Sequence, residues 1–98
     1  MRGPCRRDEA LYFKVRETLE RMIDLAHLVL DRAEEQQQRK AAAAARYVIR
    51  EVQLLVEQLA AWEPDEEVCY DEFISRIRRY YGILRAAARK LGVELPGI

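Results

Sequence analysis

The stretch EEQQQRK, residues 34–40, separates two apolar heptad patterns and decides how the chain folds. Before it, apolar residues recur at alternating spacings of three and four, the pattern of a helix with one buried seam. The first seam consists of Tyr12, Val15, Leu19, Met22, Ala26, Val29 and Ala33. The second seam, after the stretch, consists of Ala45, Val48, Val52, Leu55, Leu59 and Trp62. The two seams are out of phase by two residues, which is about 200° around a helix axis.

This phase difference leaves two folds open. A turn within 34–40 brings both seams onto one core, and the wholly polar character of this segment favours such a turn. Without a turn, one helix of about 50 residues carries its stripes on opposite sides and needs a second chain, as in a helical dimer or a domain-swapped rod.

A third seam follows Pro64 and ends before Gly92. Pro64 cannot donate a backbone hydrogen bond and disfavours the helical conformation at Glu63, while Gly92 fits the position after a helix end. The third seam consists of Tyr70, Phe73, Ile77, Tyr80, Leu84, Ala87 and Leu91. The sequence therefore predicts an all-α three-helix antiparallel bundle with coiled-coil-like heptad seams. Its predicted helices are 8–34, 40–62 and 68–91.

Length and charge predict a single helical domain over 1–98, with a basic N-terminal arm at 1–7 and a short C-terminal tail at 92–98. The 17 basic and 17 acidic residues give a net charge of zero, so no overall field attracts nucleic acid or an anionic membrane. No apolar run is long enough to span a bilayer, and none follows the basic start of the chain as in a signal peptide. We therefore expect a cytoplasmic protein that does not bind membranes.

The residues that enzymes and metal sites need are scarce. The chain has one serine, Ser75, and one histidine, His27, and it has no glycine-rich phosphate loop. Cys5 and Cys69 are too far apart in sequence for a zinc motif. His27 falls on an acidic outer line of the first helix with Glu20, Asp24 and Asp31, which we interpret as a solvated face. We expect no catalytic residue, metal, cofactor or small-molecule substrate, and hence no enzyme.

Arg21 and His27 form an Arg-x5-His spacing. It resembles the Arg-x4–6-His motif of HEPN-type ribonucleases, which are also small α-helical bundles. The resemblance covers two residues, and Met22 follows the arginine where that family tends to have a polar residue. It implies RNA cleavage as a residual alternative function.

The two cysteines raise a separate question. Cys5 precedes the first predicted helix and Cys69 lies near the start of the third, so an up-down-up bundle places both at one end. A disulfide is compatible with that arrangement, whereas two free thiols are expected in a reducing cytosol. The sequence leaves both states open.

The outer faces carry the functional signal. Four apolar residues of the first two helices lie off the seams and are predicted to point outward for self-association: Phe13, Leu28, Tyr47 and Leu54. Basic residues flank Gly82 on the third helix, and we predict that these residues and Gly82 contact a partner or phosphates. The basic residues are Arg76, Arg78, Arg79, Arg85, Arg89 and Lys90. We expect a non-enzymatic protein–protein interaction and assembly module that forms a homodimer and engages another protein. The alternative is a small nucleic-acid-binding subunit that uses the basic face of the third helix.

Overall fold

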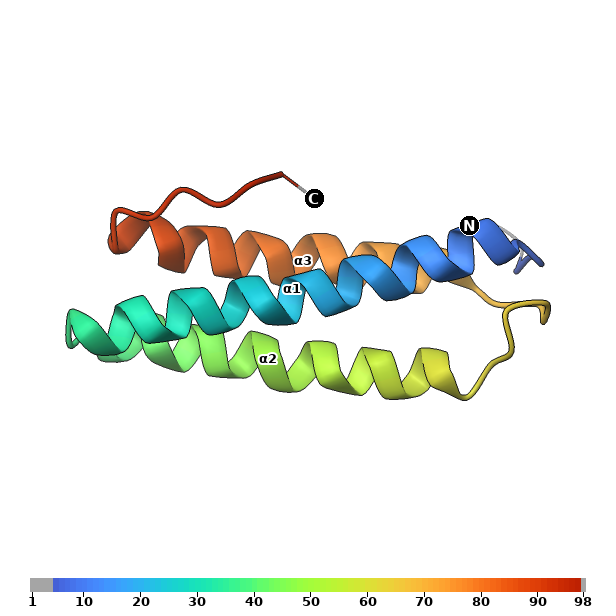
Figure 1. Cartoon of the computed structure of the whole chain (residues 1–98), viewed down its shortest axis with the longest axis horizontal. Coiled ribbons are helices and arrows are strands. Elements are labelled where there is room, and N and C mark those ends of the chain that lie inside the picture. The colour runs from blue at the N-terminus through green and yellow to red at the C-terminus, as the bar shows by residue number, and fades with distance from the viewer. Residues whose placement is uncertain (1–4, 98) are drawn as a thin grey trace.

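Three helices form the bundle in a computed structural model that describes residues 5–97. They are α1 (Glu9–Glu35), α2 (Arg39–Ala60) and α3 (Tyr70–Lys90). α1 and α3 run in the same direction and α2 runs against both (Figure 1). The fold is the predicted all-α three-helix bundle, and no helix end differs from its predicted position by more than two residues. Residues 1–4 of the predicted arm and residue 98 of the tail lie outside the described residues.

The three seams meet in one core, because each helix turns its apolar stripe inward. Every residue of the predicted seams is buried except Trp62, whose exposed fraction is 44%. Trp62 was expected to continue the second seam, and this expectation is wrong. α2 ends at Ala60, so the chain has left the helical path before it reaches Trp62.

The turn between α1 and α2 occupies Gln36, Gln37 and Gln38. Gln37 adopts a left-handed φ of 55°, and its N–H donates to the carbonyl oxygen of Glu34 over 3.1 Å. The Gln38 N–H donates to the carbonyl oxygen of Ala33 over 2.8 Å. These two bonds form a Schellman motif, which ends a helix by satisfying its last carbonyl groups. The hairpin thus replaces the alternative of one continuous rod, and it brings the two out-of-phase seams together.

At the opposite end of the bundle, the segment before α1 is tied to the segment before α3. Arg6 and Val68 form an isolated antiparallel bridge with two backbone hydrogen bonds of 3.0 Å. Beside the bridge, a disulfide joins Cys5 to Cys69, so these two thiols are not free. The carboxylate of Asp8 accepts the N–H of Leu11 over 3.0 Å and caps the start of α1. This part of the arm is therefore a structured component of the fold.

The C-terminal tail turns back along α3 (Figure 1). Gly92 has a φ of 72°, and its N–H donates to the carbonyl oxygen of Arg89 over 3.2 Å. The N–H of Val93 reaches the carbonyl oxygen of Ala88 over 2.9 Å, which completes a second Schellman motif. Gly92 is thus the helix stop that the sequence predicts, and it reverses the chain direction.

Candidate interaction surfaces

The four residues predicted to mediate self-association do not form one surface. Phe13, Leu28 and Leu54 are exposed, at 45%, 44% and 46%. Phe13 and Leu28 are fifteen residues apart on α1, a separation of about 22 Å along the helix axis. A single patch that contains all four residues is therefore not present.

The position of Tyr47 differs from the one predicted for self-association. Tyr47 was expected to point outward, but it is half-buried and its ring packs edge-on against Tyr80 of α3. The ring centroids are 6.0 Å apart, in the range of a favourable aromatic pair. The side of α2 that carries Tyr47 therefore faces α3. Leu54 follows Tyr47 by seven residues and so lies on the same side of α2.

Phe13 and Trp62 instead line one groove between the start of α1 and the end of α2. We call it the Phe13–Trp62 groove. Its lining residues are Tyr12, Phe13, Arg16, Glu20, Val56, Leu59, Ala60, Trp62, Glu63 and Pro64. The rings of Tyr12 and Phe13 meet edge to face with centroids 5.4 Å apart. Two large aromatic side chains, each a little less than half exposed, thus share one concave surface.

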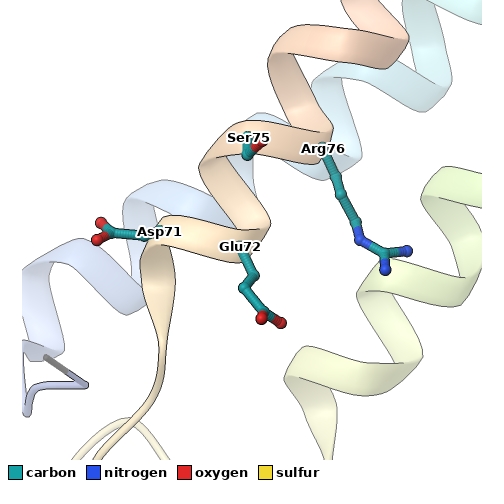
Figure 2. Close-up of a pocket in the computed structure, with 4 residues that line it drawn as sticks. All are labelled: Asp71, Glu72, Ser75 and Arg76. Carbon is teal, nitrogen blue, oxygen red and sulfur yellow. The ribbon is translucent and has the colours of Figure 1, made fainter. Parts of the chain in front are cut away.

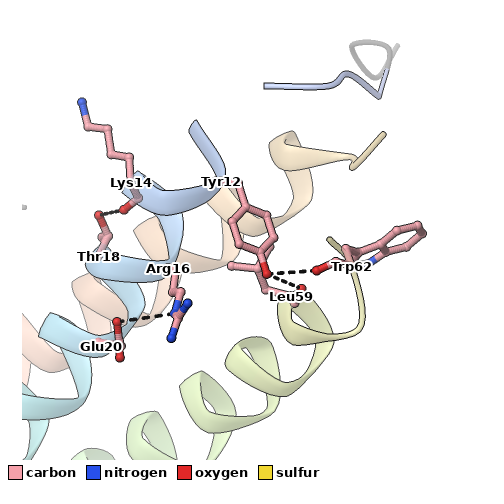
Figure 3. A network of polar contacts seen from close by, with 7 residues as sticks. All are labelled: Tyr12, Lys14, Arg16, Thr18, Glu20, Leu59 and Trp62. Atoms are coloured by element: carbon pink, nitrogen blue, oxygen red, sulfur yellow. Dashed lines mark hydrogen bonds and ion pairs between the residues drawn. The ribbon is translucent and has the colours of Figure 1, made fainter. Parts of the chain in front are cut away.

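Tyr12 holds this groove in shape. Its hydroxyl donates to the carbonyl oxygen of Trp62 over 3.0 Å and lies 3.3 Å from the carbonyl oxygen of Leu59 (Figure 3). The backbone of Trp62 is therefore fixed against α1, while its indole ring points away from the helices (Figure 3). Arg16 and Glu20 form an exposed ion pair at 3.9 Å on the rim.

The apolar character continues from this groove toward the α1–α2 turn. Ile23 and Leu30 follow Arg16 by seven and fourteen residues and so lie on nearly the same side of α1. Ile49 precedes Val56 by seven residues on α2. All four of these apolar side chains are half-buried against the core. The α1–α2 side of the bundle therefore presents an apolar strip that begins at the two exposed aromatic residues.

Sequence reasoning missed Trp62 because it extended the heptad seam to the last apolar residue. Pro64 is a signal for the end of the second helix. A proline disfavours the α-helical conformation at the residue before it, here Glu63, which follows Trp62 directly. The second helix was predicted to extend to residue 62, although this signal indicates an earlier end that leaves the indole exposed.

The basic residues predicted on the third helix are all exposed, but they form two lines. Arg78, Arg85 and Arg89 follow one another at seven and four residues, on the side of α3 near α1 and the tail. Arg76, Arg79 and Lys90 lie on the other side of Gly82. A Cβ at Gly82 would meet no atom within 4 Å. The ion pairs Arg16–Glu20 and Arg46–Glu34 involve none of these six cations.

A shallow hollow lies at the start of α3 and is lined by Asp71, Glu72, Ser75 and Arg76 (Figure 2). Asp71 points away from the other three side chains, and Arg76 points toward α2 (Figure 2). The four side chains therefore do not converge on one point. In the part of the chain that the structure describes, no three His, Cys, Asp or Glu side chains gather as metal ligands would.

Arg21 and His27 are both exposed on α1, as predicted for His27. Their separation of six residues directs the two side chains about 120° apart around the helix. The structure therefore does not bring them together.

Comparison of the chain with protein-family models, with curated proteins and with solved structures finds no match. None of the helices between residues 5 and 97 combines the length and the apolar character needed to cross a membrane. Function is therefore inferred from the exposed surfaces themselves.

Proposed function

We propose that this chain is a non-enzymatic protein–protein interaction module that self-associates as a homodimer through the Phe13–Trp62 groove. The observation that carries the proposal is the presence of two exposed aromatic residues in the lining of one groove. Isolated exposed apolar side chains are ordinary on protein surfaces, whereas adjacent ones on a shaped surface are typical of contact sites. Aromatic residues are also enriched in interfaces between proteins.

The rim of the groove supports a second copy as the partner. A two-fold symmetric interface places the same surface on both sides, so it must be complementary to itself. The rim carries Arg16 and Glu20, one charge of each sign, on adjacent turns of α1. A two-fold axis that passes between these two turns of α1 would set Arg16 of one copy opposite Glu20 of the other.

Sedimentation equilibrium of the full chain tests this proposal. We expect a dimer, and we expect Phe13→Glu and Trp62→Glu each to weaken dimerisation by at least about tenfold, since a buried charge at the interface centre costs more than 1.4 kcal/mol. Leu54→Glu is the matched control, because Leu54 is as exposed as Phe13 but lies on the side of α2 that carries Tyr47. Far-ultraviolet circular dichroism shows whether each variant keeps its helices. A monomeric wild-type chain, or equal weakening by Leu54→Glu, contradicts the proposal.

The exposed basic residues of α3 support a second candidate function, nucleic-acid binding. Exposed cations are available to phosphate groups, and such binding weakens steeply with salt. The test is retention of the chain on single- and double-stranded nucleic acid at low and high salt. We expect Arg78→Glu/Arg85→Glu to abolish retention, and absence of binding by the wild-type chain at low salt rules this candidate out.

A further inference from the structure

The C-terminal tail packs against the side of α3 that is nearer α1. Val93 and Leu95 are half-buried against the core, whereas Glu94 and Pro96 between and after them are exposed. The hydroxyl of Tyr81 donates to the carbonyl oxygen of Pro96. Alternate residues of the tail thus face the bundle, as in an extended strand.

The groove that the tail approaches continues beyond it, between the first halves of α1 and α3. We call this uncovered part the open half of the α1–α3 groove. It is lined by Leu11, Lys14, Val15, Thr18, Ile74, Ile77, Arg78 and Tyr81. Tyr81 joins the two parts, because it lines the open half and also holds Pro96 of the tail.

α1 and α3 are parallel, and the residues that face the groove recur at the same interval on both helices. Leu11, Thr18 and Leu25 recur every seven residues along α1. Ile74 and Tyr81 recur at the same interval on α3. Residues seven apart lie on nearly the same side of a helix, so these side chains form one line along each helix, apolar except for Thr18.

Basic side chains border both parts. Arg85 and Arg89 line a hollow together with Val93, Glu94 and Leu95 of the tail. Lys14 and Arg78 border the open half. The acidic residue of the tail thus lies beside two arginines, and the open half offers a similar pair of cations with no described segment above it.

We propose that the open half of the α1–α3 groove is a docking site for an extended segment of a partner protein in which apolar and acidic residues alternate. The tail sequence Val93-Glu-Leu-Pro96 occupies the adjoining part as an internal segment of this same chemistry. From Leu11 to Thr18 the open half spans about 10 Å, the length of about three extended residues. Leu25 lies on the same side of α1 about 21 Å from Leu11, so a floor that continues to Leu25 accommodates about six residues.

The proposal is independent of the homodimer. The Phe13–Trp62 groove uses Phe13, Arg16 and Glu20 of α1 toward α2. The open half uses Leu11, Lys14 and Thr18 of α1 toward α3. Success or failure at one groove therefore leaves the other unaffected.

The test measures fluorescence anisotropy of a labelled peptide, Val-Glu-Leu-Pro-Val-Glu-Leu-Pro, with the full chain. A matched peptide with lysine in place of each glutamate is the control. We expect the acidic peptide to bind and the lysine peptide to bind at least about tenfold more weakly, because the rim is basic. Leu95→Ser, which weakens the packing of the tail, is expected to tighten binding of the acidic peptide by about tenfold, since it frees Tyr81 at the end of the open half.

Two further measurements locate the binding. Arg78→Glu alters an exposed rim residue, keeps the fold, and is expected to weaken binding of the acidic peptide about tenfold. Backbone amide shifts on peptide addition are expected at Leu11, Thr18 and Tyr81. Three outcomes each overturn the proposal. They are equal binding of the two peptides, no binding of the acidic peptide to the wild-type chain or to the Leu95→Ser variant, and amide shifts centred on Trp62. Dimers that form through exchange of the tail between copies also overturn it, because the occupant is then a second copy.

Discussion

The hydroxyl of Tyr12 on α1 donates a 3.0 Å hydrogen bond to the backbone carbonyl oxygen of Trp62, two residues beyond the end of α2. Because Trp62 lies beyond the helix, its carbonyl oxygen accepts no N–H of the helical ladder. The Tyr12 hydroxyl gives this oxygen a donor and also fixes the position from which the indole ring extends.

We expect Tyr12→Phe to lower the free energy of unfolding by about 1 kcal/mol, because it removes this hydrogen bond and keeps the ring in the core. Urea denaturation measures the loss. Tyr47→Phe is the control, since within the described residues the Tyr47 side chain makes a ring contact and its hydroxyl donates to no acceptor. Equal effects of the two substitutions are evidence against the assigned role of Tyr12.

Gln37→Gly is expected to stabilise the hairpin. Gln37 holds a left-handed φ of 55°, which costs a residue with a Cβ about 1–2 kcal/mol. Glycine adopts this conformation without that cost but loses more backbone entropy on folding, so the net gain is about 0.5–1 kcal/mol. Thermal denaturation measures the gain. Gln38→Gly, at a negative φ, should give no such increase, and a loss of stability in Gln37→Gly argues against the turn.

Reduction of the disulfide is expected to lower stability. Cys5 and Cys69 are separated by 64 positions, and for a loop of this length the chain-entropy model gives about 4 kcal/mol. Melting with and without a reductant measures the effect, and the Cys5→Ser/Cys69→Ser variant should melt at the lower temperature under both conditions. Equal melting temperatures of the oxidised and reduced wild-type chain contradict this expectation.

Stability is expected to fall at alkaline pH because two buried tyrosines favour their neutral form. Burial raises the pKa of Tyr70 and Tyr80, and the nearby charges of Asp8 and Glu51 raise them further. In the unfolded chain these groups titrate near pH 10. Their contribution is therefore complete below about pH 10 and is lost as the pH rises through the higher pKa of the folded state.

Urea midpoints measured at several alkaline pH values test this dependence. The variant Tyr70→Phe/Tyr80→Phe is expected to lose less stability than the wild type over the same interval, because its two rings do not ionise. Identical slopes for the two chains show that other groups control the alkaline transition.

Gly82→Ala is expected to stabilise the isolated chain by about 0.5–1 kcal/mol. Gly82 lies inside α3, and an added Cβ meets no atom within 4 Å, so only the helix propensity changes. Denaturant titration measures the gain. A loss of stability shows that the site is more crowded than the structure describes.

Much of the fold follows from local sequence pattern. Burial selects apolar residues with the helical period, so the seams identify the inward side of each helix, and Gly92 and Pro64 mark helix limits. The sequence left open whether the chain turns at 36–38, because glutamine does not favour the left-handed conformation that Gln37 adopts. Only packing of both seams into one core makes that conformation favourable at Gln37.

The sequence by itself determined three amphipathic helices, their approximate ends and their buried residues. Tertiary structure decided which side of each helix meets which neighbour. A heptad pattern distinguishes inward from outward, but it does not say whether a flanking residue leans toward one adjacent helix or the other. For this reason Tyr47 packs on Tyr80, Phe13 lines one groove with Trp62, and the tail lies beside Tyr81. Both proposed binding grooves arise from these relations between helices, which no single helix encodes.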